Sequence, residues 1–321
     1  MIRTPSTTDT HQLCDWAELM AVCSGRGLTS VGDIIKVIQP DDSRQDDKYA
    51  DDDESTNDEM IAEEVLQIAR RRSDVLGEDY PFILDGKVLK QVISTHVKKA
   101  DLYLFHLLFS TIEADQISQD ARHLFEVESM AALTSYFGGE SFHFGWTPTN
   151  ARLGKIQKRI EDFCGSATLG WKARNPVAVS PNSNEVGIDV LVWKQPKDLR
   201  SNALVFVAQC ATGHNWRAKL ETSSLRLLED CLETTRDGPW VSCFCTPFHI
   251  PDSLWRDSAR RHDGMLFDRI RLVLARRSGS TPRTAQEVLS ETAQWTNRVV
   301  KKLVKQMRTK TKKRRLLLKR S

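Results

Sequence analysis

Long apolar runs are absent from this sequence of 321 residues. No stretch approaches about 18 consecutive apolar residues, so no segment is predicted to span a membrane. The opening residues, MIRTPSTTDTHQ, also lack the apolar stretch of a signal peptide. The seven cysteines form no CxxC pairs, which indicates neither a disulfide framework nor a structural zinc site. These absences together predict a cytoplasmic protein without a membrane partner.

Internal repeats are absent as well, and Gly and Pro are not enriched. Hydrophobic residues make up 40% of the chain and charged residues 28%, which is typical of globular proteins and excludes a disordered or fibrous chain. The length is about twice that of one ordinary domain and is sufficient for a sizeable core.

Charge is segregated along the chain. Residues 41–64 hold twelve acidic residues and two basic ones, whereas residues 298–321 hold twelve Lys and Arg and no acid. The acidic run is interpreted as a solvated linker, with masking of the basic tail or contact with a basic partner as alternatives. The basic tail either grips phosphates or is a solubilising terminus.

These patterns divide the chain into five regions. We expect a small helical N-terminal region, an acidic linker, a helical region that packs on the core, an α/β core, and a C-terminal helix with a basic tail, at residues 1–40, 41–64, 65–119, 120–276 and 277–321.

The first 119 residues are predicted to be helical. Apolar spacing indicates a helix after the capping segment Thr8-Asp9-Thr10, and further helices lie near residues 31–38, 60–69 and 102–112. Arg70–Arg72 are interpreted as the solvated polar end of the third helix.

Residues 120–276 alternate between helix and strand patterns. Strands are predicted at 167–172, 186–193, 203–210 and 240–245, and helices at 119–137, 150–163, 216–232, 252–261, 265–276 and 284–306. This alternation predicts an α/β fold with a central mixed sheet flanked by helices.

Two polar residues stand out in these apolar strands. Asp189 begins one strand and Gln209 ends the next, and burial of a lone carboxylate would be costly. The short polar connection between the strands predicts an antiparallel hairpin, which would bring the two side chains together. Their oxygen atoms suit Mg²⁺ (or Mn²⁺). The alternatives are a structural acid at Asp189 and a satisfied core amide at Gln209.

A third oxygen ligand is predicted on the helix ARHLFEVESMAAL. Glu126 lies on or close to the buried stripe of this helix, whereas Glu128 lies off the stripe and is expected to be solvated. The alternative for Glu126 is a solvated or salt-bridged helix residue.

With these residues the sequence resembles the restriction-endonuclease-like, PD-(D/E)xK nuclease superfamily over roughly residues 120–276. Glu126 matches the helix acid, Asp189 the strand acid, and Gln209 the first position of the (D/E/Q)xK tripeptide. The segments GHNWRAK, PFHIP and LFDRIRL resemble a Gln-containing bacterial branch. The resemblance implies a restriction-endonuclease-like core and a divalent metal ion bound by these three side chains and the Cys210 carbonyl.

The sequence departs from the motif at its lysine. Gln209-Cys210-Ala211 has Ala211 where the family has Lys. A migrated lysine is sought first at Lys219, with His214 as a weaker general base and Lys194 as the last candidate, since five residues from Asp189 place it on the opposite strand face. Thr212, Gly213, His214 and Asn215 are expected to bind substrate phosphate, or to form a turn with Asn215 as a helix cap.

The resemblance implies a Mg²⁺-dependent endodeoxyribonuclease, an effector of a bacterial anti-phage or restriction system. DNA is the expected substrate, RNA is the alternative, and a homodimer or a partner protein of the defence system follows from the resemblance alone. The competing hypothesis is a catalytically inactive nuclease-fold subunit that binds DNA or assembles with a partner, because Ala211 replaces the lysine.

Overall fold

The computed structural model describes residues 1–39, 52–92, 100–144, 156–167, 169–174, 187–198, 200, 202–221, 224–233, 238–276 and 283–317. The chain forms two compact units, residues 1–116 with 290–321 and residues 117–289. Within the described ranges no helix is long and apolar enough to cross a membrane.

The first unit combines helices with a small sheet. Its antiparallel strands have the order β1-β3-β2. The elements are α1 (Thr10–Cys23), β1 (Leu28–Ser30), α2 (Val31–Ile38), α3 (Asp52–Leu76), a 3-10 turn (Gly77–Asp79), β2 (Phe82–Asp85), β3 (Val88–Gln91), α4 (Ala100–Thr111), a 3-10 turn (Ala114–Gln116) and most of α10 (Arg283–Leu317). The predicted helices are present, and Asp9 caps α1 as expected, but the three strands are additions to a region for which only helices and an acidic linker were named.

Helix α3 begins at Asp52, so it occupies the second half of the run expected to be an acidic linker; the first half, up to residue 51, lies outside the described residues. Helix α10 likewise continues past residue 306 into the predicted basic tail. In both segments the charged residues lie on a helix whose apolar positions, such as Val65 and Trp295, are buried. A charge run and a helix are therefore compatible here.

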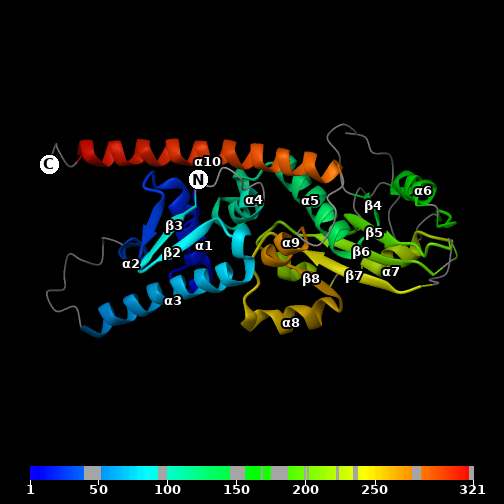
Figure 1. The fold of residues 1–321 in the computed structure, drawn as a ribbon, viewed down its shortest axis with the longest axis horizontal. Helices are drawn as coiled ribbons and strands as arrows, with labels where there is room; N and C mark the ends of the chain where they lie inside the picture. Colours follow the sequence, from blue (N-terminus) through cyan, green and yellow to red (C-terminus); the bar gives the residue numbers. More distant parts are fainter. Residues whose placement is uncertain are drawn as a thin grey trace. The chain divides into compact units, whose positions relative to one another are not determined.

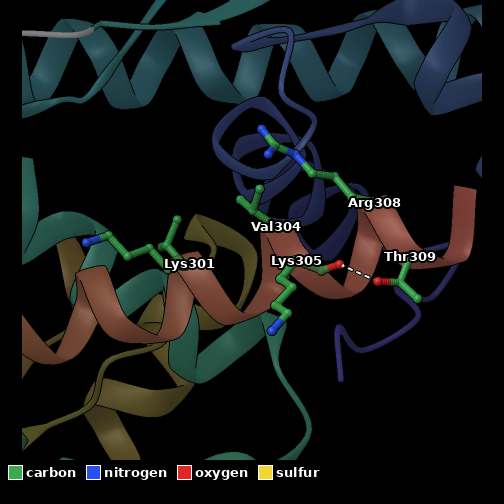
Figure 2. Close-up of a pocket in the computed structure, with 6 residues that line it drawn as sticks. Lys301, Val304, Lys305, Arg308 and Thr309 are labelled. Atoms are coloured by element: carbon green, nitrogen blue, oxygen red, sulfur yellow. Dashed lines mark hydrogen bonds between the residues drawn. The ribbon is translucent and has the colours of Figure 1, made fainter. Parts of the chain in front are cut away.

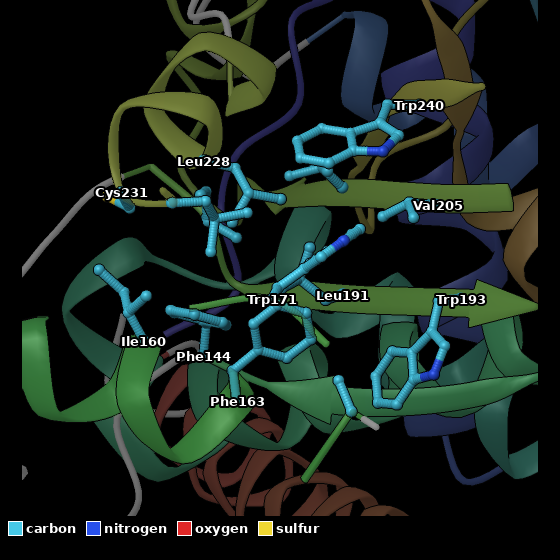
Figure 3. Packing of buried hydrophobic residues seen from close by; sticks show 14 of the residues in the cluster. Phe144, Ile160, Phe163, Trp171, Leu191, Trp193, Val205, Leu228, Cys231 and Trp240 are labelled. Carbon is cyan, nitrogen blue, oxygen red and sulfur yellow. The ribbon is translucent and has the colours of Figure 1, made fainter. Parts of the chain in front are cut away.

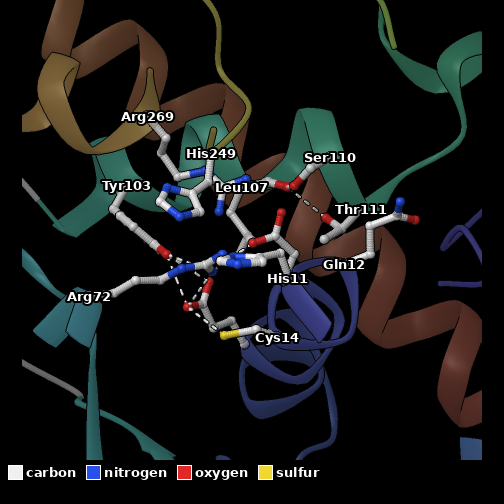
Figure 4. Close-up of polar contacts among 12 residues, drawn as sticks. His11, Gln12, Cys14, Arg72, Tyr103, Leu107, Ser110, Thr111, His249 and Arg269 are labelled. Carbon is white, nitrogen blue, oxygen red and sulfur yellow. Dashed lines mark hydrogen bonds and ion pairs between the residues drawn. The ribbon is translucent and has the colours of Figure 1, made fainter. Parts of the chain in front are cut away.

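Arg72 corrects a sequence expectation. It is buried, although Arg70–Arg72 were predicted to be a solvated helix end. Its guanidinium lies 2.6 Å from Asp15 and 2.9 Å from Glu18. The Glu18 carboxylate also accepts hydrogen bonds from Tyr80 and Tyr103. Figure 4 shows Arg72 beside Tyr103, to whose hydroxyl it donates at 3.3 Å. The cause is its spacing of seven residues from the buried Val65, which places it on the apolar stripe of α3.

The second unit contains a five-stranded mixed sheet with strand order β4-β5-β6-β7-β8 (Figure 1). Strands β4, β5 and β6 are antiparallel neighbours, and β6, β7 and β8 run parallel. The elements are α5 (Gln119–Phe137), β4 (Glu140–His143), α6 (Ile156–Ser166), β5 (Val190–Lys194), β6 (Leu204–Cys210), a 3-10 turn (Trp216–Lys219), α7 (Ser224–Asp230), β7 (Trp240–Cys245), α8 (Asp252–His262), β8 (Met265–Phe267) and α9 (Arg269–Ala275). The predicted α/β class, mixed sheet, flanking helices and β5–β6 hairpin are confirmed.

Three predicted elements differ from the structure. The helix expected at 216–232 is divided into the 3-10 turn Trp216–Lys219 and α7 (Ser224–Asp230). The strand expected at 167–172 is absent from the described residues of that segment, where Ala173 forms only an isolated bridge with Leu232. The helix expected at 265–276 is divided into β8 and α9, because Asp268 caps α9 by accepting a hydrogen bond from the Arg271 N–H at 3.0 Å. The beginnings of the segments predicted at 150 and 186 lie outside the described residues.

The two faces of the sheet have different coverings. Leu191, Trp193, Val205 and Val207 pack with residues of α6 and α7 in an apolar cluster on one face (Figure 3). On the other face Phe206 stacks on Phe137 of α5, with ring centroids 3.4 Å apart. Even-numbered residues of β6 therefore face α5, and odd-numbered ones face the apolar cluster.

We predict that Arg72→Met lowers the free energy of unfolding by about 3–5 kcal/mol, because it leaves the buried carboxylate of Glu18 without its cation. Chemical denaturation followed by circular dichroism measures the loss. Arg71→Met, at an exposed position on the same helix, is the control and should change stability little. Equal stability of the two variants would contradict this role for Arg72.

Candidate functional site

Asp189 lies at an irregularity of the hairpin. The register pairs Val190 with Ala208, and the Asp189 N–H also donates to the Ala208 carbonyl, at 2.9 Å. Two consecutive residues thus oppose one, as in a β-bulge. On its other side the Asp189 carbonyl accepts from the Phe144 N–H at 2.7 Å. The backbone of Asp189 is therefore fixed from both neighbouring strands.

The Asp189 carboxylate is held at the end of β6. Its Oδ2 atom accepts a hydrogen bond from the Cys210 N–H at 2.6 Å. The pKa of Asp189 is raised to about 7, first by burial and then by the negative charge of Glu126. The Cys210 hydrogen bond, His143 and Lys219 act in the opposite direction. Two carboxylates that repel each other in a partly buried position form a site suited to a cation.

Glu126 meets two histidines on the α5 side of the sheet. Its Oε2 atom lies 3.0 Å from Nε2 of His143 and 4.0 Å from Nδ1 of His123. His123 precedes Glu126 by three residues on α5, and His143 ends β4, where it pairs with Val190 on the face that α5 covers. Asp189 and Glu126, which the sequence predicted to be close, are thus brought together.

Basic side chains lie around these carboxylates. Arg159 donates to the Phe144 carbonyl at 2.6 Å, and burial lowers its pKa while the charges of Glu126 and Asp189 raise it. Lys219 is exposed, and its positive charge lowers the pKa of Asp189, although less than the Cys210 hydrogen bond and His143 do. The arrangement offers acids for a cation and exposed positive charge for an anion.

The motif residues after Asp189 do not join this group. Gln209 is an odd-numbered residue of β6, so its side chain lies on the face opposite to Phe206 and α5. It is 7% exposed, and its Oε1 atom has no hydrogen-bond partner in the described part of the chain. Ala211 is fully buried in an apolar cluster with Trp216 and Phe244. The position of the motif lysine is therefore a packing position, which explains the alanine physically.

The loop after β6 is tied to α5. The Thr212 hydroxyl accepts a hydrogen bond from Arg122 at 3.0 Å. His214 is exposed, with its ring 5.0 Å from that of Phe248. Asn215 precedes the 3-10 turn, but its side chain makes no capping hydrogen bond, contrary to the capping role considered for it. The Gly213 carbonyl accepts a hydrogen bond from the Trp216 N–H, which closes the turn.

Among the candidates for a migrated lysine, Lys194 is remote. It ends β5 at the opposite end from Asp189, and its Nζ atom donates to the Phe137 carbonyl at 3.5 Å. For Cys210, the observed polar contact is a donation by its N–H, whereas the sequence analysis assigned a ligand role to its carbonyl.

Glu128 is also a correction. It was expected to be solvated, but it is fully buried and lies 2.8 Å from Arg276. Burial raises the pKa of Glu128 to about 7, against the opposing effect of the Arg276 charge. Its spacing of three residues from the buried Phe125 places it on the apolar stripe, where the ion pair joins α5 to the residue after α9.

His123, His143 and Arg159 were not identified from the sequence. His123 and Glu126 have the i, i+3 spacing that puts two ligands on one helix face, and this signal was available. His143 lies on a strand that was not predicted, so its proximity to α5 had no sequence signal.

Helix α10 carries a basic surface in the first unit. A hollow along the helix is lined by two valines, three basic residues and one threonine: Val300, Lys301, Val304, Lys305, Arg308 and Thr309 (Figure 2). Lys301, Lys305 and Arg308 are exposed. Exposed cations on a helix are suited to binding a polyanion.

We predict that Asp189→Asn stabilises the protein more at pH 8 than at pH 5, by on the order of 2 kcal/mol. A carboxyl whose folded pKa is raised from 3.8 to about 7 contributes stability that is fully present below pH 3.8 and lost as the pH rises through about 7. The amide does not ionise, so the variant lacks this loss. Denaturation of both proteins at the two pH values measures it, and an equal gain at both would contradict the raised pKa.

Comparison of the chain with protein-family models, with curated proteins and with solved structures gives no match.

Proposed function

We propose that the protein is a divalent-metal-dependent nuclease that hydrolyses phosphodiester bonds of DNA, on a sheet of the restriction-endonuclease-like type. The observation that carries this proposal is the placement of two acids on the α5 side of the sheet. Asp189 accepts from the Cys210 N–H, and Glu126 contacts His143, which pairs with the residue after Asp189. The charges of Glu126 and Lys219 both act on the pKa of Asp189. Paired carboxylates with an adjacent cation suit a metal ion and a phosphate at the same time.

The residues fit a metal ion in part. Asp189 and Glu126 supply carboxylate oxygens, the ligands that hard divalent cations prefer, whereas the pleat turns the Gln209 amide to the other face. When bound, such an ion supplies a water of lowered pKa and polarises the scissile phosphate.

The chain's own groups have separate roles in this proposal. The Cys210 N–H fixes the orientation of the Asp189 carboxylate. Lys219, which is exposed, offsets the negative charge that develops on the phosphate. Thr212, held by Arg122, positions the loop in which Gly213, His214 and Asn215 approach the substrate backbone.

The cations of α10 favour a nucleic acid as the partner. Lys/Arg side chains along a helix bind phosphates without sequence preference and release counterions, so affinity falls with salt. In this proposal α10 adds non-specific affinity for DNA, and the carboxylates carry the chemistry. A role in defence against phage, RNA cleavage and a homodimer all remain hypotheses from the family resemblance.

We predict that Asp189→Asn and Glu126→Gln each reduce cleavage of plasmid DNA in Mg²⁺ or Mn²⁺ by at least about 100-fold, because each removes a charge that holds the metal ion. Both replacements keep the shape of the side chain. The control is Asp198→Asn, an exposed acid in the β5–β6 connection that pairs with Arg200. Tight, metal-independent DNA binding without cleavage by the wild-type protein would instead support the inactive DNA-binding subunit.

A second prediction concerns the lysine. Lys219→Ala should lower the cleavage rate by roughly 10- to 100-fold at saturating DNA, because the cation acts on charge developed in the transition state. Lys194→Ala, at the far end of β5, is the matched control and should retain the wild-type rate. If the two variants cleave equally fast, Lys219 is not the migrated lysine.

A further inference from the structure

Two histidines and one carboxylate converge next to Asp189. The ligand atoms of His123, Glu126 and His143 all lie within 4.8 Å of one another. The rings of the two histidines have their centroids 5.0 Å apart and are inclined at 56°. They come from different elements, α5 and β4, so the grouping is produced by the fold and not by one helix turn.

The distances suit a shared ion. Two ligand atoms that each lie about 2.1 Å from a tetrahedral ion are roughly 3.4 Å apart. The observed separations of Glu126 Oε2 from His143 Nε2 and from His123 Nδ1 are 3.0 Å and 4.0 Å, on either side of that value. Small side-chain movements are sufficient to reach it, and all three residues are only partly buried, which leaves room for water or substrate on the ion.

The surroundings of both histidines disfavour the charged imidazolium. Burial lowers the pKa of His123 to about 4, with a further contribution from the proximity of His143. Burial also lowers the pKa of His143 to about 4.

The donor set indicates the class of metal. Mg²⁺ prefers oxygen ligands, whereas imidazole nitrogen suits Zn²⁺, Fe²⁺, Co²⁺, Ni²⁺ and Cu²⁺. Two histidines and one carboxylate leave open coordination positions on such ions. Asp189, whose carboxylate is close enough to Glu126 for their charges to interact, is positioned beside these open positions.

We propose that His123, Glu126 and His143 form a binding site for one divalent transition-metal ion, with Asp189 beside it. This inference deepens the proposed nuclease function, because it names a transition-metal ion that accepts imidazole in place of Mg²⁺. Only the role of the bound ion in cleavage rests on the proposed function. The competing explanation is a positioning role, in which His143 merely orients Glu126 by a hydrogen bond.

Metal binding itself tests the proposal, without reference to cleavage. The full-length protein, freed of metal with a chelator, is titrated with Co²⁺ and Zn²⁺ in a calorimeter and by visible absorption of Co²⁺. We expect one ion per chain and an affinity well above that for Mg²⁺. Replacement of a residue that only hydrogen-bonds to a metal ligand lowers metal affinity by roughly 10- to 100-fold. His123 and His143 are proposed as direct ligands, so His123→Ala and His143→Ala should each weaken Co²⁺ binding by about 100-fold or more.

His214→Ala is the control for loss of an imidazole, because His214 is exposed and outside the cluster. It should bind Co²⁺ as the wild-type protein does. Because His143 is part of β4 and its replacement also alters the strand, pulsed electron paramagnetic resonance on the unaltered protein with Cu²⁺ gives a second measurement. Nitrogen couplings from two imidazoles are expected.

Different results separate this inference from the proposed function. Tight binding that depends on His123 and His143, in a protein that does not cut DNA, supports the metal site and contradicts the nuclease. Mg²⁺-dependent cleavage that is unaffected by loss of either histidine overturns the metal site and leaves the nuclease in place. Absence of nitrogen couplings also overturns it.

Discussion

The pleat of β6 determines which of its side chains face α5, where the candidate site lies, and which face the opposite layer. This strand has an antiparallel neighbour on one side and a parallel neighbour on the other, so its register is fixed by both. Phe206 and Ala208 face α5, and Val207 and Gln209 face the opposite layer. Because side chains alternate strictly, no local change could bring Gln209 to the carboxylates without moving the whole strand. The chemistry is thereby confined to the α5 side.

Much of the fold was predictable from periodicity. Helix α5 and strand β7 have the bounds predicted for them, because a long amphipathic stripe and a fully apolar run are strong signals. Strands β4 and β8 have only four and three residues, too few to show alternation, and β8 was absorbed into a predicted helix. Charge was the other source of error, since acidic and basic runs were interpreted as linker and tail although α3 and α10 include parts of them.

Some residues of the candidate site could be predicted from the sequence and others could not. Asp189 and Glu126 were recognisable because acids in apolar surroundings require a partner. Gln209 was placed with them by assuming a regular hairpin, and the bulge at Asp189 cannot be seen in the sequence. Arg72 was assigned to the polar end of its helix, and Glu128 was placed off the buried stripe of its helix. Their spacing from Val65 and Phe125 placed both on buried stripes, so heptad or i, i+3 position was the better guide.

Helix α5 carries a residue of the candidate site, Glu126, two positions before a buried structural residue, Glu128. Glu126 turns toward the histidines, and two residues later Glu128 is clamped in the interior by Arg276. A rotation of the helix by even part of a turn would separate Glu126 from His143 and break the internal pair together. The orientation of Glu126 is thus set by the Glu128–Arg276 contact, which lies outside the candidate site. A substitution at Glu128 is therefore expected to alter the position of Glu126 as well.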